Sequence, residues 1–87
     1  MYKGRLDCGF DFEVEEERAD SFELVEALAE AEESRIAVPK VASLLYGEEQ
    51  KKKLIDYLRE ENGFVPYDKV EDAITDTFSK ISELKNS

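Results

Sequence analysis

Apolar and polar residues alternate along the first fifteen positions of the chain. Alternation with a period of two is typical of β-strands that bury one face. A three-residue loop at positions 7–9 places side chains of like or complementary character opposite each other, and it puts Gly9 where the turn needs a positive φ. The opposed pairs are Leu6 with Phe10, Arg5 with Asp11, Gly4 with Phe12, Lys3 with Glu13 and Tyr2 with Val14. The pattern predicts a two-stranded β-hairpin over about 2–7 and 9–15.

Beyond residue 15 the apolar residues recur at intervals of three and four, which is the period of an amphipathic helix. Capping and breaker residues divide this region into four predicted helices, at about 20–33, 39–46, 48–61 and 67–84. A hairpin of two strands is marginal alone in water, so we expect its apolar face to lie on the helices. The sequence therefore predicts an α+β, mostly α fold in a single domain that covers residues 1–87.

The first predicted helix is amphipathic and acidic. It follows a connection at residues 15–18 that carries no apolar side chain and is expected to be solvated. Asp20 is the predicted N-cap, and Glu23 three residues later completes a capping-box-like pair. Its predicted apolar stripe consists of Phe22, Val25, Leu28 and Ala29, flanked by Leu24 and Ala31.

Proline and glycine mark the boundaries of the later helices. Pro39 is expected at the first position of the second helix, where its missing N–H costs nothing. Gly47 is expected to end or kink that helix. Asn62-Gly63 predicts the stop of the third helix, with Gly63 in the left-handed conformation and Phe64 folding back on the last turn.

The last predicted helix has the most regular apolar stripe in the chain. The stripe consists of Val70, Ala73, Ile74, Thr77, Phe78, Ile81 and Leu84. Such stripes are most often core, whereas their exposed edges are where a partner helix would lie. We expect the partner-binding residues at the connection before this helix and toward its far end, namely Phe64, Tyr67, Ile81 and Leu84.

The formal net charge of −10, without any histidine, changes the set of expected partners. Affinity for nucleic acid depends on lysine and arginine that displace condensed counterions, so no direct contact with nucleic acid is expected. The single cysteine suits a reducing compartment. No apolar run approaches the roughly 20 residues of a membrane span, and no signal-peptide h-region is present, so we expect a cytoplasmic protein without membrane contact.

The candidate chemistry is weak. The Asn62-Gly63 turn between two helices is similar to the centre of an EF-hand, but the first and last ligand positions would be Leu58 and Lys69. Cys8 has no histidine to act as its base. The many carboxylates fall on helix faces that are predicted to be exposed to solvent, whereas general acid–base catalysis needs a carboxylate whose pKa is shifted by burial or a close charge. We therefore expect no catalytic, metal or cofactor site and no small-molecule substrate.

Two parts of the chain resemble a family of small acidic phage proteins. The first comprises residues 9–14 and 22–30, and the second, stronger one runs from Val38 to Phe78. Both resemble the tail assembly chaperone-like proteins of long-tailed phages and prophages of Gram-positive bacteria. The resemblance implies a non-enzymatic protein in the bacterial cytoplasm that coats the tape-measure protein and recruits tail-tube subunits during tail assembly. Association into a homo-oligomer stays open.

Two alternatives remain beside this resemblance. A head–tail connector or another virion morphogenesis protein would have a similar sequence pattern. An acidic mimic of DNA that inhibits a nucleic-acid enzyme is a different class, and it would need carboxylates spaced like phosphates. Here the carboxylates alternate with basic residues at 51–53, 59, 69 and 80, which favours the tail protein.

Overall fold

The N-terminal hairpin has the strand pairing that the alternation predicts. In the computed structural model, which describes residues 1–86, β1 (Tyr2–Arg5) pairs antiparallel with β2 (Asp11–Val14), and every opposed pair within the strands agrees with the predicted register. The Leu6 N–H donates to the Phe10 carbonyl at 2.8 Å, and the Gly9 N–H donates to the Leu6 carbonyl at 2.8 Å. Gly9 has a φ of 100°. The three-residue loop with a left-handed glycine is therefore confirmed.

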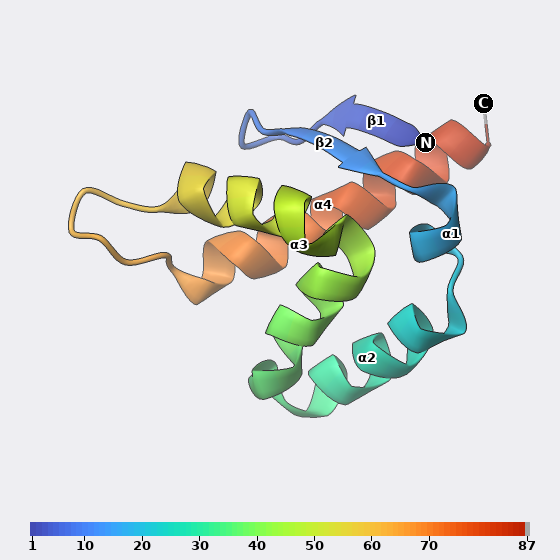
Figure 1. Cartoon of the computed structure of the whole chain (residues 1–87), viewed down its shortest axis with the longest axis horizontal. Helices are drawn as coiled ribbons and strands as arrows, with labels where there is room; N and C mark the ends of the chain where they lie inside the picture. Colours follow the sequence, from blue (N-terminus) through green and yellow to red (C-terminus); the bar gives the residue numbers. More distant parts are fainter. Residues whose placement is uncertain (87) are drawn as a thin grey trace.

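All the other regular elements of the described chain are helical, which confirms the α+β, mostly α fold (Figure 1). The elements in order are α1 (Glu16–Ala19), α2 (Phe22–Glu33), the 3-10 turn η1 (Arg35–Ala37), α3 (Val38–Leu58) and α4 (Tyr67–Lys85). The connection at residues 15–18 is solvated as expected at Glu15, Glu16 and Glu17, which are exposed, but it enters the helical turn α1 and its last residue, Arg18, is half-buried. Ala19 packs against the core, and the Arg18 guanidinium donates to the Leu44 carbonyl at 3.4 Å.

The predicted N-cap of α2 is wrong by one residue. Ser21 caps the helix, and its hydroxyl oxygen accepts a hydrogen bond from the Leu24 N–H at 3.2 Å. Asp20 instead forms an ion pair with Lys85, with 2.7 Å between Oδ1 and Nζ. The Asp20 carboxylate, which was predicted to cap α2, thus joins the start of α2 to the end of α4.

A bend at Gly47 joins the predicted second and third helices into α3. Gly47 has a φ of 78° and a ψ of 164°, which is outside the helical region, and helical structure continues on both sides of it. The predicted kink is confirmed, although α3 begins at Val38, one residue before Pro39, and ends at Leu58 rather than near residue 61. Figure 1 shows that the two halves of α3 run in different directions.

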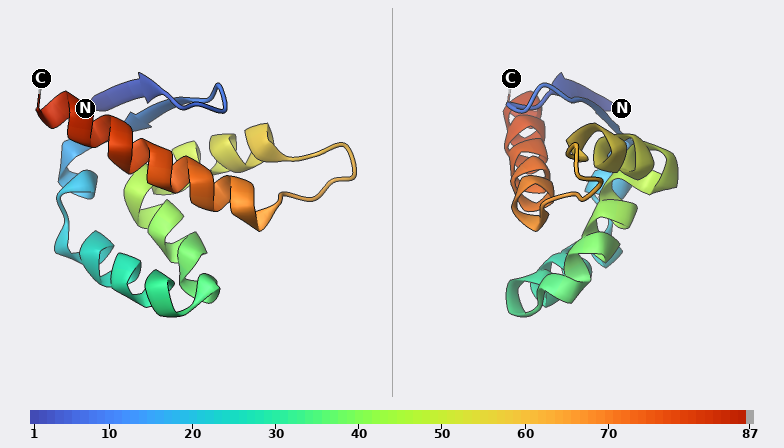
Figure 2. Two further views of the ribbon diagram at one scale, coloured as in Figure 1. Left: turned by 180° about the vertical axis from the view of Figure 1, so that it is seen from behind. Right: turned by 90° about the vertical axis from the view of Figure 1, so that its left-hand side faces the viewer.

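The hydrophobic core lies between the inner face of the hairpin, α3 and α4. Figure 2 shows the hairpin across the C-terminal half of α4 and the second half of α3. The largest fully buried side chains are Phe12, Val14, Leu24, Val41, Leu45, Leu54 and Thr77. The expectation that the apolar face of the hairpin lies on the helices is confirmed, since Phe10, Phe12 and Val14 are all buried.

One buried hydrogen-bonded chain joins α3 to α4. The Thr77 hydroxyl donates to the Ala73 carbonyl at 2.8 Å, and the Tyr46 hydroxyl forms a hydrogen bond with Thr77 Oγ1 at 2.7 Å. Burial raises the pKa of Tyr46, and its hydrogen bond with Thr77 opposes this shift only in part. The fold therefore stabilises the neutral phenol.

This raised pKa predicts a loss of stability in alkali. In the unfolded chain Tyr46 ionises near its ordinary pKa of about 10, whereas the folded chain keeps it neutral, so the stabilisation is complete below about pH 10 and is lost as the pH rises further. Tyr46→Phe should cost about 1 kcal/mol at neutral pH through the lost hydrogen bond, and the variant should lose less stability above about pH 10.

Urea denaturation of both proteins across this pH range provides the measurement. Ion pairs with Asp7 and Asp20 raise the pKa of Lys80 and Lys85, so these lysines add to the alkaline loss in both proteins. The difference in the free energy of unfolding between the wild type and Tyr46→Phe therefore reports the contribution of Tyr46 alone. Identical pH slopes for the two proteins would show that the Tyr46 phenol is not protected by the fold.

Candidate protein-binding surface

The connection between α3 and α4 is a turn that extends away from the helices. The Glu60 N–H donates to the Phe64 carbonyl at 2.9 Å, and the Gly63 N–H donates to the Glu60 carbonyl at 2.9 Å. This is the same pattern that closes the loop of the N-terminal hairpin, again with glycine at the third loop position. Gly63 has a φ of 88°, as predicted, but it belongs to this turn and not to the end of α3.

Phe64 is the outward side chain of this turn. Its N–H donates to Asn62 Oδ1 at 3.0 Å, while its side chain is 75% exposed. The expectation that Phe64 folds back onto the last helical turn is wrong, because α3 ends at Leu58 and an extended segment carries Phe64 away from it. Figure 1 shows the turn at one end of the molecule, beyond the helices. Phe64 is thus accessible to a partner.

Tyr67 begins α4 and is half-buried. The Arg35 guanidinium lies over its ring, with 4.0 Å between Cζ and the ring centroid, and the Tyr67 hydroxyl donates to Glu71 Oε2 at 3.1 Å. A cation over an aromatic face is attracted by the ring quadrupole. Tyr67 therefore holds η1 beside α4 and exposes only part of its surface.

The two candidates in the last turns of α4 have different environments. Ile81 is 4% exposed and belongs to the core, so the expectation that it lies at an exposed edge is wrong. The hairpin covers this part of α4, with Lys80 Nζ 3.1 Å from Asp7 Oδ1. Leu84 is 44% exposed, but α4 is roughly 28 Å long, which places Leu84 far from Phe64. The four predicted residues do not form one surface.

The outer face of α2 exposes apolar residues that were predicted to be buried. Phe22 and Val25 are 70% and 59% exposed, whereas Leu24 and Ala27 are buried. Ile36, in η1 beyond the end of α2, is 88% exposed. The prediction of the inner stripe of α2 is therefore wrong. The signal that could have identified this surface is the number of apolar residues in α2, which is larger than one helix face can bury.

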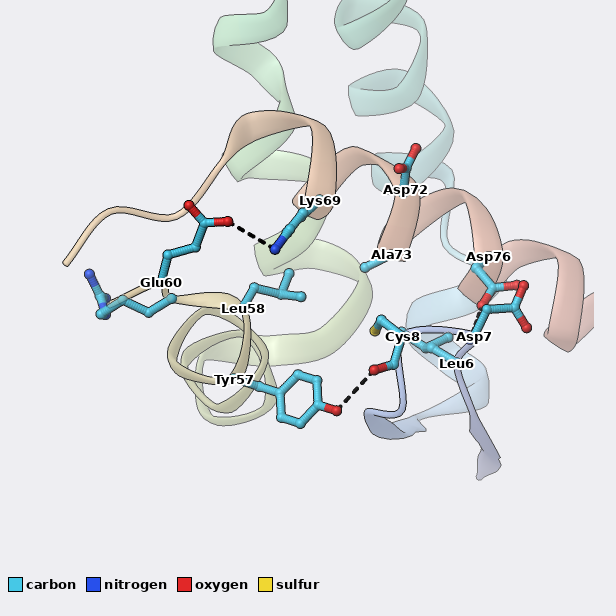
Figure 3. A pocket seen from close by; sticks show the side chains of 11 residues that line it. Leu6, Asp7, Cys8, Tyr57, Leu58, Glu60, Lys69, Asp72, Ala73 and Asp76 are labelled. Carbon is cyan, nitrogen blue, oxygen red and sulfur yellow. Dashed lines mark hydrogen bonds and ion pairs between the residues drawn. The ribbon is translucent and has the colours of Figure 1, made fainter. Parts of the chain in front are cut away.

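A hollow of about 690 Å³ lies between the hairpin loop, the end of α3 and α4. Figure 3 shows its lining, in which the Tyr57 hydroxyl donates to the Cys8 carbonyl at 2.9 Å and Lys69 forms an ion pair with Glu60 at 3.0 Å. On its other side the Asp7 N–H donates to Asp76 Oδ2 at 2.7 Å. These contacts tie the hairpin loop and the projecting turn to the helices.

Three further findings concern metals, membranes and known proteins. Within residues 1–86, no group of three or more His, Cys, Asp or Glu residues could hold a metal ion. No helix in the described part of the chain is long and apolar enough to cross a membrane. The chain matches no family model, no curated protein and no solved structure.

Proposed function

We propose that this chain is a non-enzymatic protein-binding domain that acts as a tail assembly chaperone, contacting tape-measure and tail-tube proteins while a phage or prophage tail is built. The observation that carries the proposal is a pair of exposed apolar surfaces at separate places on one small acidic domain. One is Phe64 on the turn between α3 and α4, and the other is Phe22 and Val25 on α2. Figure 1 shows this turn and α2 at separate places on the molecule. Large exposed apolar side chains are typical of sites where proteins bind.

The charge of the domain supports the same role. A formal net charge of −10 opposes aggregation of a domain that exposes apolar side chains. Two separate surfaces would let one copy bind two partners at once. A protein that covers a tape-measure protein and also recruits tail-tube subunits must do this. In this proposal α2 faces the tape-measure protein, and the Phe64 turn faces the tail-tube subunit.

Co-expression with the tape-measure and tail-tube proteins of the same genome tests the proposal. The chain should co-purify with both proteins and increase the soluble fraction of the tape-measure protein. Failure to recover either protein would contradict the proposal. Recovery of a nuclease or a repressor in their place would instead favour the inhibitor alternative.

Phe64→Ala separates binding from folding in the same experiment. Because Phe64 is 75% exposed, we expect the melting temperature to stay close to that of the wild type. Recovery of the tail-tube protein should fall by about tenfold or more, as for an aromatic anchor at an interface. Unfolding of the variant, seen by circular dichroism, would show that Phe64 has a structural role. Unchanged recovery by a folded variant would remove Phe64 from the interface.

A further inference from the structure

One row of apolar side chains leads from the outer face of α2 toward the interior. Phe22, Val25, Leu28 and Ala31 are spaced by three, so consecutive members are neighbours on the helix surface. Their exposure decreases along the row, from 70% at Phe22 and 59% at Val25 to half-buried at Leu28 and Ala31. The row is therefore a continuous apolar path across the surface of α2.

The row ends in a groove between α2 and α4, with α3 contributing to its lining. Leu28 and Ala31 form its wall on α2, and Val41 of α3 and Ile74 of α4 add further apolar surface. The volume of the groove is about 310 Å³. The left-hand panel of Figure 2 shows the side of the molecule on which α4 passes in front of α3, above α2. A groove with an apolar lining between helices is a common docking place for an amphipathic helix.

The ionisable side chains that line this groove have one sign. The two ionisable residues that line it are Glu32 and Glu71. Helix α2 carries five glutamates and no basic residue, and among the described residues only Glu30 of these five forms an ion pair, with Lys40 at 3.5 Å. The nearby Arg35 lies over the Tyr67 ring. The apolar path is thus bordered by carboxylates, and all of them except Glu30 lack an ion-pair partner within residues 1–86.

We propose that this groove and the row leading into it dock an amphipathic helix whose apolar stripe is flanked by lysine or arginine. The inference rests on the proposed protein-binding role and specifies the chemistry of the partner segment. Apolar contact with Phe22, Val25 and Leu28 supplies affinity, and basic flanks pair with the carboxylates at the border and select against acidic helices.

A second copy of this chain does not fit the same surface. Docking α2 on α2 would bring together two helices that each carry five glutamates and no basic residue, and each copy carries a formal net charge of −10. Like charges placed opposite each other across an interface are costly. The occupant is therefore a basic segment of a different protein.

A synthetic peptide tests the proposal without any phage protein. The probe is a fluorescein-labelled helix of about 20 residues, with leucines at i, i+3, i+4 and i+7 and lysine or arginine on both flanks. Fluorescence anisotropy should show saturable binding that weakens as salt rises from about 0.05 to 0.5 M. A peptide with the same leucines and glutamine flanks should bind about tenfold more weakly or worse.

Two phenylalanines of similar exposure provide a matched pair of variants. Phe22→Ser and Phe64→Ser remove the same side chain, 70% and 75% exposed respectively, and leave the charge unchanged. Phe22→Ser should weaken peptide binding by about tenfold or more, and Phe64→Ser should leave it unchanged. No effect of Phe22→Ser would overturn the proposal, because the peptide would then bind through charge alone. Equal losses in the two variants would overturn it as well, because binding would then not be specific to α2.

The test does not depend on one variant. NMR spectra of the wild-type protein should show the largest peptide-induced shifts in the amides of α2 and of residues 71–75 of α4, and shifts confined to other segments would overturn the proposal. If the peptide binds at α2 but the tape-measure protein does not co-purify, the proposed function is wrong and the inference stands. If the tape-measure protein co-purifies equally well with Phe22→Ser, the inference and the placement of that protein on α2 are wrong, and the wider chaperone role stands.

Discussion

Phe12→Ala is expected to lower the free energy of unfolding by about 3–5 kcal/mol, a large share of the about 5–15 kcal/mol typical of a domain. Phe12 is 1% exposed, lies in the middle of β2 opposite Gly4, and faces the helices. Removing its ring leaves a cavity where the hairpin meets the core. Urea denaturation followed by circular dichroism measures the loss.

Gly4 provides the companion variant for this prediction. A Cβ at Gly4 would lie 2.8 Å from Phe12 Cε1, closer than real Cβ atoms approach other atoms, so Gly4→Ala should destabilise the wild type. In the Phe12→Ala background the ring is absent, and alanine should stabilise the strand relative to glycine by roughly 0.5–1 kcal/mol. The two changes should therefore be strongly non-additive. Additive costs would show that the ring does not lie over Gly4.

Gly47→Ala is the second change with a large expected cost. With a φ of 78° and a ψ of 164°, Gly47 has a backbone conformation that is essentially restricted to glycine, so alanine should cost about 1–3 kcal/mol in strain. The new Cβ would also lie 3.1 Å from Arg18 Cζ, which must move. A straightened α3 would shift α2, so peptide binding at the groove should weaken together with stability.

Gly63→Ala is the matched control for Gly47→Ala. Gly63 also has a positive φ, 88°, but a Cβ there would have no other atom within 4 Å. Both variants place alanine in a strained backbone conformation. Only Gly47→Ala also brings a Cβ close to Arg18 and alters the bend in α3. Thermal unfolding should show the larger loss for Gly47→Ala. Equal losses would mean that the surroundings of Gly47 contribute nothing beyond backbone strain.

The hairpin was predictable from sequence because its constraints are local. A register slip of one residue would move every side chain to the wrong face, and only the loop at residues 7–9 pairs like with like. The glycine bend in α3 was predictable for a similar reason, since Gly47 interrupts a helical pattern. The start of α2 was not, because Asp20 and Ser21 are both good caps, and Asp20 instead ends α1 and pairs with Lys85, which is distant in sequence.

The rotation of α2 was mispredicted because the sequence contains two apolar rows. The row with Phe22 and Val25 is larger and was assigned to the core, but the row with Leu24 and Ala27 is the buried one. That choice depends on tertiary contacts that no local pattern contains.

The candidate partner-binding residues were likewise predictable only where their exposure is decided locally. The exposure of Phe64 follows from its place in a turn, which the sequence indicates. The burial of Ile81 depends on the hairpin lying across α4, and the sequence of that helix alone contains no sign of it. The groove at Leu28 and Ile74 likewise exists only because α2 and α4 both pack on α3, which contributes Val38 and Val41 to its lining.

Co-purification with the tape-measure protein, compared between wild type, Phe22→Ser and Phe64→Ser, tests the central claim most directly. The account predicts that the wild type and Phe64→Ser recover the tape-measure protein in similar amounts, and that Phe22→Ser recovers about tenfold less while remaining folded. Absence of the tape-measure protein from the wild-type sample would contradict the proposed function. Equal recovery by all three proteins would contradict the assignment of binding to α2.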